Sequence, residues 1–270
     1  MATVVHPAGN VDFDSQAVST GDILEIREGT QTIDTDLDRS SDQLNGFRTF
    51  PNFRGQLGTA AAPAIIRVDN ASAPKATIGC NASVVYLAAA GTGGITALDA
   101  QKGSGKLYLA GSGTIATLNV YGGEVEIGAG CIVTTLNVYG GTVIIVSNGT
   151  GITTLTNHAG QVFTRRSVTT ANCEGGLVQL AAAAACTTAN VRGSATLNHR
   201  STGTVGTCNM AGSATLTPAY ALTNPVITTL NLNSPQVRYV YKAGAVYFVP
   251  GTTNNNAGTS VTTESAGTAP

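Results

Sequence analysis

A seven-residue motif recurs along the chain at an interval too short for helical repeats. TLNVYGG stands at Thr117–Gly123 and again at Thr135–Gly141, 18 residues later. Related copies lie on both sides, and we align all eight on one position, called the anchor: Leu98, Leu118, Leu136, Leu155, Ala171, Ala189, Cys208 and Leu230. Neighbouring anchors are 16 to 22 residues apart. Repeats built from helices need about 33 residues or more to hold two helices and a turn, so they are excluded.

The residue types around the anchor alternate between apolar and polar. Thr precedes the anchor in seven of the eight copies, and apolar residues stand three before the anchor in all eight. Such alternation indicates strands with one buried face, and Thr, Val and Ile favour strand geometry. Gly recurs five residues after the anchor, where it permits a corner with positive φ. We therefore predict an all-β parallel β-helix, or solenoid, with short three-strand coils of about 18–20 residues that pair only with their neighbours.

Stacked coils predict two ladders of identical side chains. One is the apolar ladder of Leu98, Leu118, Leu136, Leu155 and Leu230. The other is a ladder of amides that hydrogen-bond along the solenoid axis, as in other stacked β-arrays; it comprises Asn119, Asn137, Asn172, Asn190, Asn209 and Asn231. The anchor shrinks at Ala171, Ala189 and Cys208, which predicts a narrower or reshaped section. The alanine run at Ala181–Ala185 lies beside it, and a coil this short favours strand or turn there over a helix.

Composition divides the chain into three regions. Residues 1–60 are predicted as an acidic N-terminal cap or docking segment, residues 61–250 as the solenoid, and residues 251–270 as a polar tail. Residues 1–42 hold nine acids against two Arg, a net charge of −7. An open solenoid end must be capped against aggregation, so the first segment serves as a cap, a docking element or both. Its candidate partner-interface residues are Asp34, Asp36, Asp38, Phe47, Phe50 and Phe53.

Charge and motif content argue against several functions. A net charge of −1 is unlike the basic surface of nucleic-acid-binding proteins, and no apolar run reaches the roughly 18 residues of a membrane helix. The N-terminus has no secretory pattern, and free thiols in a chain made and kept in the cytoplasm are the simplest interpretation of an odd number of Cys. The five Cys form no Cys-x-x-Cys, so neither a disulfide framework nor a zinc site is expected. We predict no metal and no cofactor.

Solenoid enzymes that act on polysaccharides need a cluster of carboxylates. Only four acids lie between residues 95 and 240: Asp99, Glu124, Glu126 and Glu174. Glu124 and Glu126 flank the inward Val125, which is typical of a solvated edge. His158 and His199 have no Asp or Cys in matching columns, so no nucleophilic triad is expected. We therefore expect no catalytic residue and no enzymatic activity.

Two features of the predicted surface fit contact with another molecule. Tyr121 and Tyr139 share one outward column in adjacent coils. They form either a sugar-binding platform or, as we prefer, a stacked aromatic ladder or part of a subunit contact. Four arginines form a basic face suited to an acidic protein surface: Arg165, Arg166, Arg192 and Arg200.

The repeat and the leader together resemble β-solenoid virion proteins of tailed bacteriophages. The residues that carry this resemblance are Ile152–Leu155 and Thr135–Val143 of the repeat and the leader Gly21–Gly58. The resemblance implies a non-enzymatic capsid decoration or cement protein on the exterior of the virion. It further implies binding to the major capsid protein and self-association as a homotrimer. The alternatives are a tail spike or tail fibre that binds or cleaves host surface glycan, and a bacterial surface adhesin.

Overall fold

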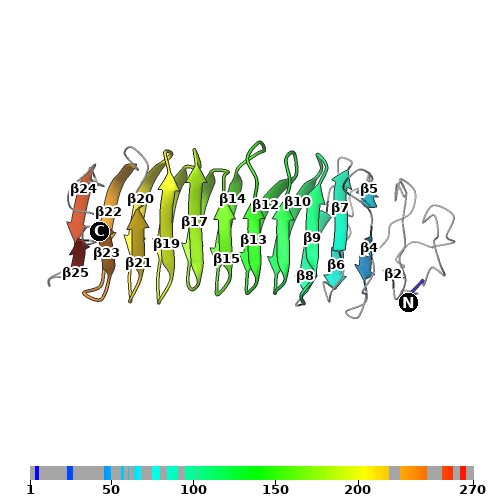
Figure 1. Ribbon diagram of the computed structural model, residues 1–270, viewed down its shortest axis with the longest axis horizontal. Coiled ribbons are helices and arrows are strands. Elements are labelled where there is room, and N and C mark those ends of the chain that lie inside the picture. The colour runs from blue at the N-terminus through cyan, green and yellow to red at the C-terminus, as the bar shows by residue number, and fades with distance from the viewer. Residues whose placement is uncertain are drawn as a thin grey trace, which may run out of the picture. The chain divides into compact units, whose positions relative to one another are not determined.

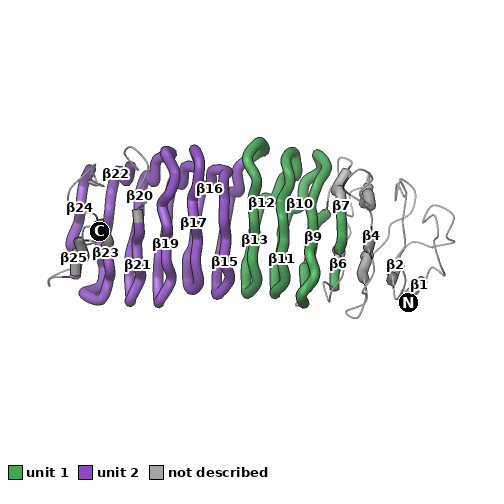
Figure 2. The backbone as a smooth tube through the Cα atoms, in the orientation of Figure 1, with its two compact units in different colours: residues 1–150 green, residues 151–270 purple. Residues whose placement is uncertain are grey.

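The computed structural model confirms an all-β parallel solenoid. It describes residues 4–5, 23–26, 46–49, 56–57, 60, 64–67, 75–79, 84–90, 95–101, 103–218, 226–241, 251–257 and 262–265. Every element among these residues is a strand. The chain divides into two compact units, residues 1–150 and 151–270, which are coloured separately in Figure 2. The boundary between the units falls inside the region predicted as solenoid.

Each unit contains two parallel sheets, whose strands alternate along the chain (Figure 1). We call the sheet that carries the anchors the anchor sheet and the other the return sheet. In unit 1 the anchor sheet holds β1 (Val4–Val5), β2 (Ile23–Ile26), β3 (Gly46–Thr49), β6 (Lys75–Gly79), β8 (Ile95–Gln101), β10 (Thr114–Val120) and β12 (Ile132–Val138). Its return sheet holds β4 (Gln56–Leu57), β7 (Val84–Ala90), β9 (Lys106–Ala110), β11 (Glu124–Ile127) and β13 (Thr142–Ile145), and β5 (Ala64–Arg67) pairs with β7.

Unit 2 repeats the same arrangement. Its anchor sheet holds β14 (Ile152–Asn157), β16 (Val168–Cys173), β18 (Cys186–Val191), β20 (Thr204–Met210), β22 (Val226–Leu232) and β24 (Thr252–Asn255). Its return sheet holds β15 (Gln161–Thr164), β17 (Leu177–Ala182), β19 (Thr196–Ser201), β21 (Thr215–Pro218), β23 (Arg238–Tyr241) and β25 (Thr262–Ser265). The alanine run ends β17 and continues as a turn, so it forms strand and turn as expected.

The register places each anchor on the next one within a unit. Leu118 pairs with Leu98 and with Leu136 in unit 1, and Ala189 pairs with Ala171 and with Cys208 in unit 2. Each of these anchors is at most 1% exposed. Inward residues of the return sheet, such as Val125 and Val178, are equally buried. The core therefore lies between the two sheets of each unit, which is the inward and outward assignment that the sequence predicts.

The coil holds two strands, although three were expected, because one strand runs without a break from three residues before the anchor to two residues after it. In β10 and β12, Ile115 pairs with Val133 and the next pair is Thr117 with Thr135. The register thus passes over the residue two before the anchor, and both Ile115 and Leu118 are buried. Since strict alternation would turn one of these two side chains outward, the strand bends at the skipped position.

Glycine forms the corner that follows the anchor sheet, as predicted. The residue five after the anchor has φ of +74° at Gly123, +78° at Gly141 and +64° at Gly176. A Cβ at Gly141 would lie 2.4 Å from the carbonyl oxygen of Gly123 in the preceding coil. The corner therefore needs glycine both for its backbone conformation and for close stacking of neighbouring coils.

The sheets continue into the flanking regions. β2 and β3 lie in the segment predicted as a cap or docking element; they pair with each other, and β3 pairs with β6 of the predicted solenoid. β24 and β25 lie in the segment predicted as a tail that is disordered when alone, and they pair with β22 and β23 of the predicted solenoid. Strand pairing of the solenoid type thus runs beyond residues 61–250 on both sides.

Candidate interaction surface

The outward asparagines of the anchor sheet form the predicted ladder. In unit 1 the Asn137 amide nitrogen donates to the Asn119 side-chain oxygen at 2.9 Å, and Asn119 donates to Asp99 at 2.7 Å. In unit 2 the donors run Asn254, Asn231, Asn209 and Asn190, each bonded to the Asn one coil earlier, at 2.6 to 2.9 Å. These amides use their hydrogen bonds within the protein, so the column stabilises the stack of coils.

A second outward column varies from coil to coil. It consists of the residues three positions after the anchor, where the chain leaves the anchor sheet, and we call it the corner column. In unit 1 it holds Gln101, Tyr121 and Tyr139, and in unit 2 it holds His158, Glu174, Arg192, Ala211, Asn233 and Asn256. The backbone of this column is fixed, since Tyr139 N donates to Val120 O at 2.7 Å and Arg192 N to Cys173 O at 2.8 Å. Variable side chains on a fixed backbone suit recognition.

Tyr121 and Tyr139 stack on each other in the corner column of unit 1. Their ring centroids are 5.0 Å apart and their planes differ by 7°. Both residues remain more than 40% exposed, and they are two of the three large hydrophobic residues recorded as exposed among those that the structure describes. Burial raises the pKa of Tyr121, with further contributions from Asp99 and Tyr139. Each ring covers one face of the other, and the ring edges and hydroxyl groups lie outside the stack.

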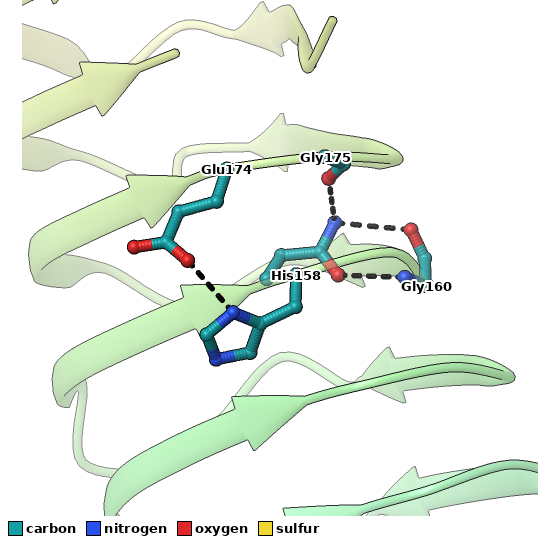
Figure 3. Close-up of polar contacts among 5 residues, drawn as sticks. His158, Gly160, Glu174 and Gly175 are labelled. Carbon is teal, nitrogen blue, oxygen red and sulfur yellow. Dashed lines mark hydrogen bonds and ion pairs between the residues drawn. The ribbon is translucent and has the colours of Figure 1, made fainter. Parts of the chain in front are cut away.

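The corner column of unit 2 carries a histidine–carboxylate contact that the sequence reasoning missed. His158 Nδ1 lies 2.7 Å from Glu174 Oε2, one coil further along (Figure 3). Both side chains are about one-third to one-half exposed, at 35% and 47%. The signal was available in the alignment, because both residues stand three after an anchor.

The Asn157 side chain fixes the backbone beneath the contact between His158 and Glu174. The side chain is fully buried and donates to the carbonyl oxygens of Gly160, Gly175 and Leu177, at 3.0 to 3.2 Å. Its oxygen accepts from Gly160 N at 3.0 Å, and Figure 3 shows Gly160 and Gly175 at the neighbouring corners. One amide thus joins two successive coils at the point where the corner column turns.

The thiols of the solenoid are buried structural groups. Cys131, Cys173, Cys186 and Cys208 are free and at most 1% exposed. Burial raises the pKa of Cys186 to about 11 and that of Cys208 to about 12, and it also raises the pKa of Cys173. Because the thiolate is the reactive form, these three thiols are poor nucleophiles at neutral pH. Cys80 lies outside the described residues.

Three of the four arginines of the predicted basic face are exposed, and one is buried. Arg166 is only 3% exposed, so it does not belong to the face. Arg192 stands in the corner column, whereas Arg165 and Arg200 are exposed in the return sheet of unit 2 or directly after its strand. In unit 1, Glu124 bonds Lys106 at 2.9 Å, and Glu124 and Glu126 lie on the outer face as expected of a solvated edge.

Several candidates lie outside the part of the chain that can be described. They are Asp34, Asp36, Asp38, Phe50 and Phe53, together with the side chain of Phe47 in β3. Among the described residues, no three His, Cys, Asp or Glu side chains are grouped so that they could hold a metal ion. In the same part of the chain, no helix is long and apolar enough to span a membrane.

Comparison with known proteins finds no match among family models, curated proteins or solved structures.

Proposed function

We propose that the chain is a non-enzymatic structural protein of a bacteriophage virion, which decorates and stabilises the capsid exterior. In this role it binds the major capsid protein and associates with itself as a homotrimer. The resemblance of its repeat and leader to phage solenoid proteins motivates the proposal. The observation that carries it is the exposed Tyr121–Tyr139 stack, which is held on coils that the backbone and the amide ladder join to one another.

The orientation of the two rings favours a protein contact over a sugar platform. A sugar packs its C–H groups against an open aromatic face, and here the stack leaves each ring at most one face for that contact. Exposed edges and hydroxyl groups are suited to edge-to-face aromatic contacts and to hydrogen bonds with a protein surface. Tyrosine is also among the residues that contribute most to binding energy in protein interfaces.

The location of the chain on a particle tests the proposal. Phage particles that contain the chain are labelled with a gold-conjugated antibody against it and imaged by electron microscopy. We expect label over the capsid. Label confined to the tail would contradict capsid decoration and support the tail spike or fibre alternative. Particles without label would contradict any virion role.

A binding assay tests the contact itself. Purified chain is added to particles from a phage that lacks its gene, and the bound fraction is measured by co-sedimentation. We expect Tyr121→Ala with Tyr139→Ala to weaken binding at least about tenfold, since an aromatic hot spot contributes about 2 kcal/mol or more. The matched control is Tyr86→Ala with Tyr108→Ala, which removes the stacked pair of the return sheet, with centroids 4.6 Å apart. Equal losses in both variants would contradict the assignment.

The glycan alternative rests on the same tyrosines beside Asp99 and the amide ladder. If it holds, a host surface polysaccharide binds the parent chain and not the Tyr121→Ala/Tyr139→Ala variant. Our proposal predicts that neither the parent nor the variant binds the polysaccharide. Isothermal titration calorimetry with both proteins measures this.

A further inference from the structure

The return sheet of unit 2 presents an outward face rich in arginine, which we call the arginine face. It comprises Arg165, Arg200 and Arg238 with Phe163, Gln179 and Asn198. Arg165 follows Thr164, which pairs with Leu180, and the next residue, Ala181, pairs with Arg200. Arg165 and Arg200 therefore occupy one column two strands apart, which corresponds to about 10 Å. All three arginines are exposed.

The outward column of Phe163, Gln179 and Asn198 orients the guanidinium group of Arg200. Phe163 pairs with Gln179, which pairs with Asn198. The Asn198 amide donates to Gln179 Oε1 at 3.3 Å, and Arg200 Nε donates to Asn198 Oδ1 at the same distance. Arginine beside a half-buried aromatic ring and adaptable amides is the composition enriched in protein interfaces.

Little acidic charge lies near Arg165 and Arg200. Residues 151–270 contain five arginines and one lysine against two acids, Glu174 and Glu264. Glu174 contacts His158 in the corner column, Glu264 pairs with Val240 at the β25 end of the sheet, and Arg166 is buried. The exposed charge of this region is therefore positive, and an occupant of the face is expected to be acidic.

The chain itself contains a segment of the required chemistry. Residues 1–42 carry a net charge of −7, and within them Asp34, Asp36 and Asp38 alternate with Ile33, Thr35 and Leu37. If this segment binds as an extended strand, its three carboxylates lie on one side, about 7 Å apart, and Ile33, Thr35 and Leu37 on the other. Carboxylates pair with guanidinium groups through two parallel hydrogen bonds, which gives both strength and geometry.

We infer that the arginine face of one copy binds the acidic segment around Asp34–Asp38 of a second copy. The inference rests on the proposed self-association and names the two surfaces that would form it. A cyclic trimer requires a heterologous interface, in which two different surfaces of neighbouring copies meet. An acidic segment and a basic face satisfy that requirement, whereas two identical faces would repel each other.

Sedimentation velocity on the full-length chain tests the inference. We expect concentration-dependent association of the parent, weakened at least about tenfold when salt rises from 0.05 to about 1 M, where the screening length falls to roughly 3 Å. We expect Arg165→Gln with Arg200→Gln to raise the dissociation constant at least about tenfold, the ratio that corresponds to 1.4 kcal/mol. The matched control, Thr153→Glu with Thr187→Glu, changes net charge equally on the exposed outer side of the anchor sheet and should change the constant less than about threefold.

A charge swap identifies the occupant. Arg165→Glu with Arg200→Glu, and separately Asp34→Lys with Asp36→Lys and Asp38→Lys, should each prevent association, and mixing the two variants should restore it. A parent that stays monomeric, arginine variants that associate like the parent, or a mixture that does not associate would each overturn the inference. The gold-labelling result does not depend on any of these outcomes, so capsid decoration can fail or stand separately.

Discussion

Unit 1 and unit 2 build the same coil with different cores. In unit 1 the anchors are Leu98, Leu118 and Leu136, and the fully buried side chains recorded there are apolar. In unit 2 the anchor column shrinks to Ala171, Ala189 and Cys208 between Leu155 and Leu230. The buried polar and charged residues that the structure describes all belong to unit 2: Asn157, Thr164, Arg166, His199 and Ser201.

Three of the buried polar side chains of unit 2 bond the backbone where the chain turns. Asn157 joins the corners of two coils, and Thr164 Oγ1 bonds both the carbonyl and the amide of Arg166. Ser201 Oγ donates to Ala184 O at 2.6 Å and accepts from Gly203 N. The shortest interval between anchors, 16 residues, lies between Leu155 and Ala171. Coils with smaller anchors are thus held in part by polar contacts at their corners, whereas the coils of unit 1 are held by apolar filling.

The largest effect is expected in the apolar core of unit 1. Leu136→Asp buries a carboxylate without a partner, and we expect it to lower the free energy of unfolding by several kcal/mol, on the order of 5. Asn137→Asp, one residue away on the outer face, loses only the donor to Asn119 and should cost about 1 kcal/mol. Chemical denaturation measures both. Similar midpoints for the two variants would show that the inward and outward assignment is wrong.

The second prediction concerns the polar corner of unit 2. Asn157→Val introduces the residue that unit 1 has at the same position, Val120 and Val138. Although valine is more apolar, we expect a loss of about 3 kcal/mol, because Gly160 N and the carbonyls of Gly175 and Leu177 lose a buried partner. A variant as stable as the parent would remove the distinction between the two cores.

The third prediction asks whether the small anchors leave space. Ala189→Leu restores the anchor of unit 1, but the side chain is fully enclosed, so we expect overpacking to cost about 1–3 kcal/mol. The reverse change, Leu136→Ala, should cost about 2–5 kcal/mol through the cavity that it leaves. Thermal unfolding measures both. A stabilised Ala189→Leu variant would mean that unit 2 is underfilled rather than differently built.

The smallest expected effect is a pH dependence of unit 2. His199 is fully enclosed, and burial lowers its pKa below the ordinary value of 6.5. The unfolded chain therefore binds the proton more readily, so this contribution to stability is complete above pH 6.5 and is lost as the pH falls towards the folded-state pKa. We expect the parent to lose more stability than His199→Leu between pH 8 and pH 5.5. Parallel curves in denaturant titrations would contradict this, and His158→Leu serves as the exposed control.

Much of the fold follows from the period of the sequence, and less of the surface does. Aligned anchors predict which residues stack, because parallel coils place equal positions next to each other. The alignment therefore predicts both the amide ladder and the burial of the thiols. The same alignment brings His158 next to Glu174, although the sequence reasoning sought only Asp or Cys partners. The strand Thr252–Asn255 is a further copy, with Thr before and Asn after the anchor position. The alignment did not include it, because its anchor, Thr253, is polar.

Other features depend on information that the period does not contain. The bend that joins two predicted strands in β10 and β12 arises from a skipped register, which residue type alone does not reveal. Arg166 looks like a surface residue by composition, yet its neighbour Thr164 fixes the backbone of that corner and Arg166 itself is buried. The surface that binds a partner is set by side chains that differ from coil to coil, and the period does not encode these.

The central claim is that successive repeats stack as parallel coils, and pyrene excimer fluorescence tests it directly. Thr117 pairs with Thr135 on adjacent strands of the anchor sheet, so pyrene attached through Thr117→Cys and Thr135→Cys should give strong excimer emission above that of the labelled parent. Pyrene attached through Thr117→Cys and Glu126→Cys should give none, because these residues lie on the outer sides of different sheets. The opposite result, with excimer only for the second pair, would show that each repeat folds as a separate hairpin and would contradict the solenoid.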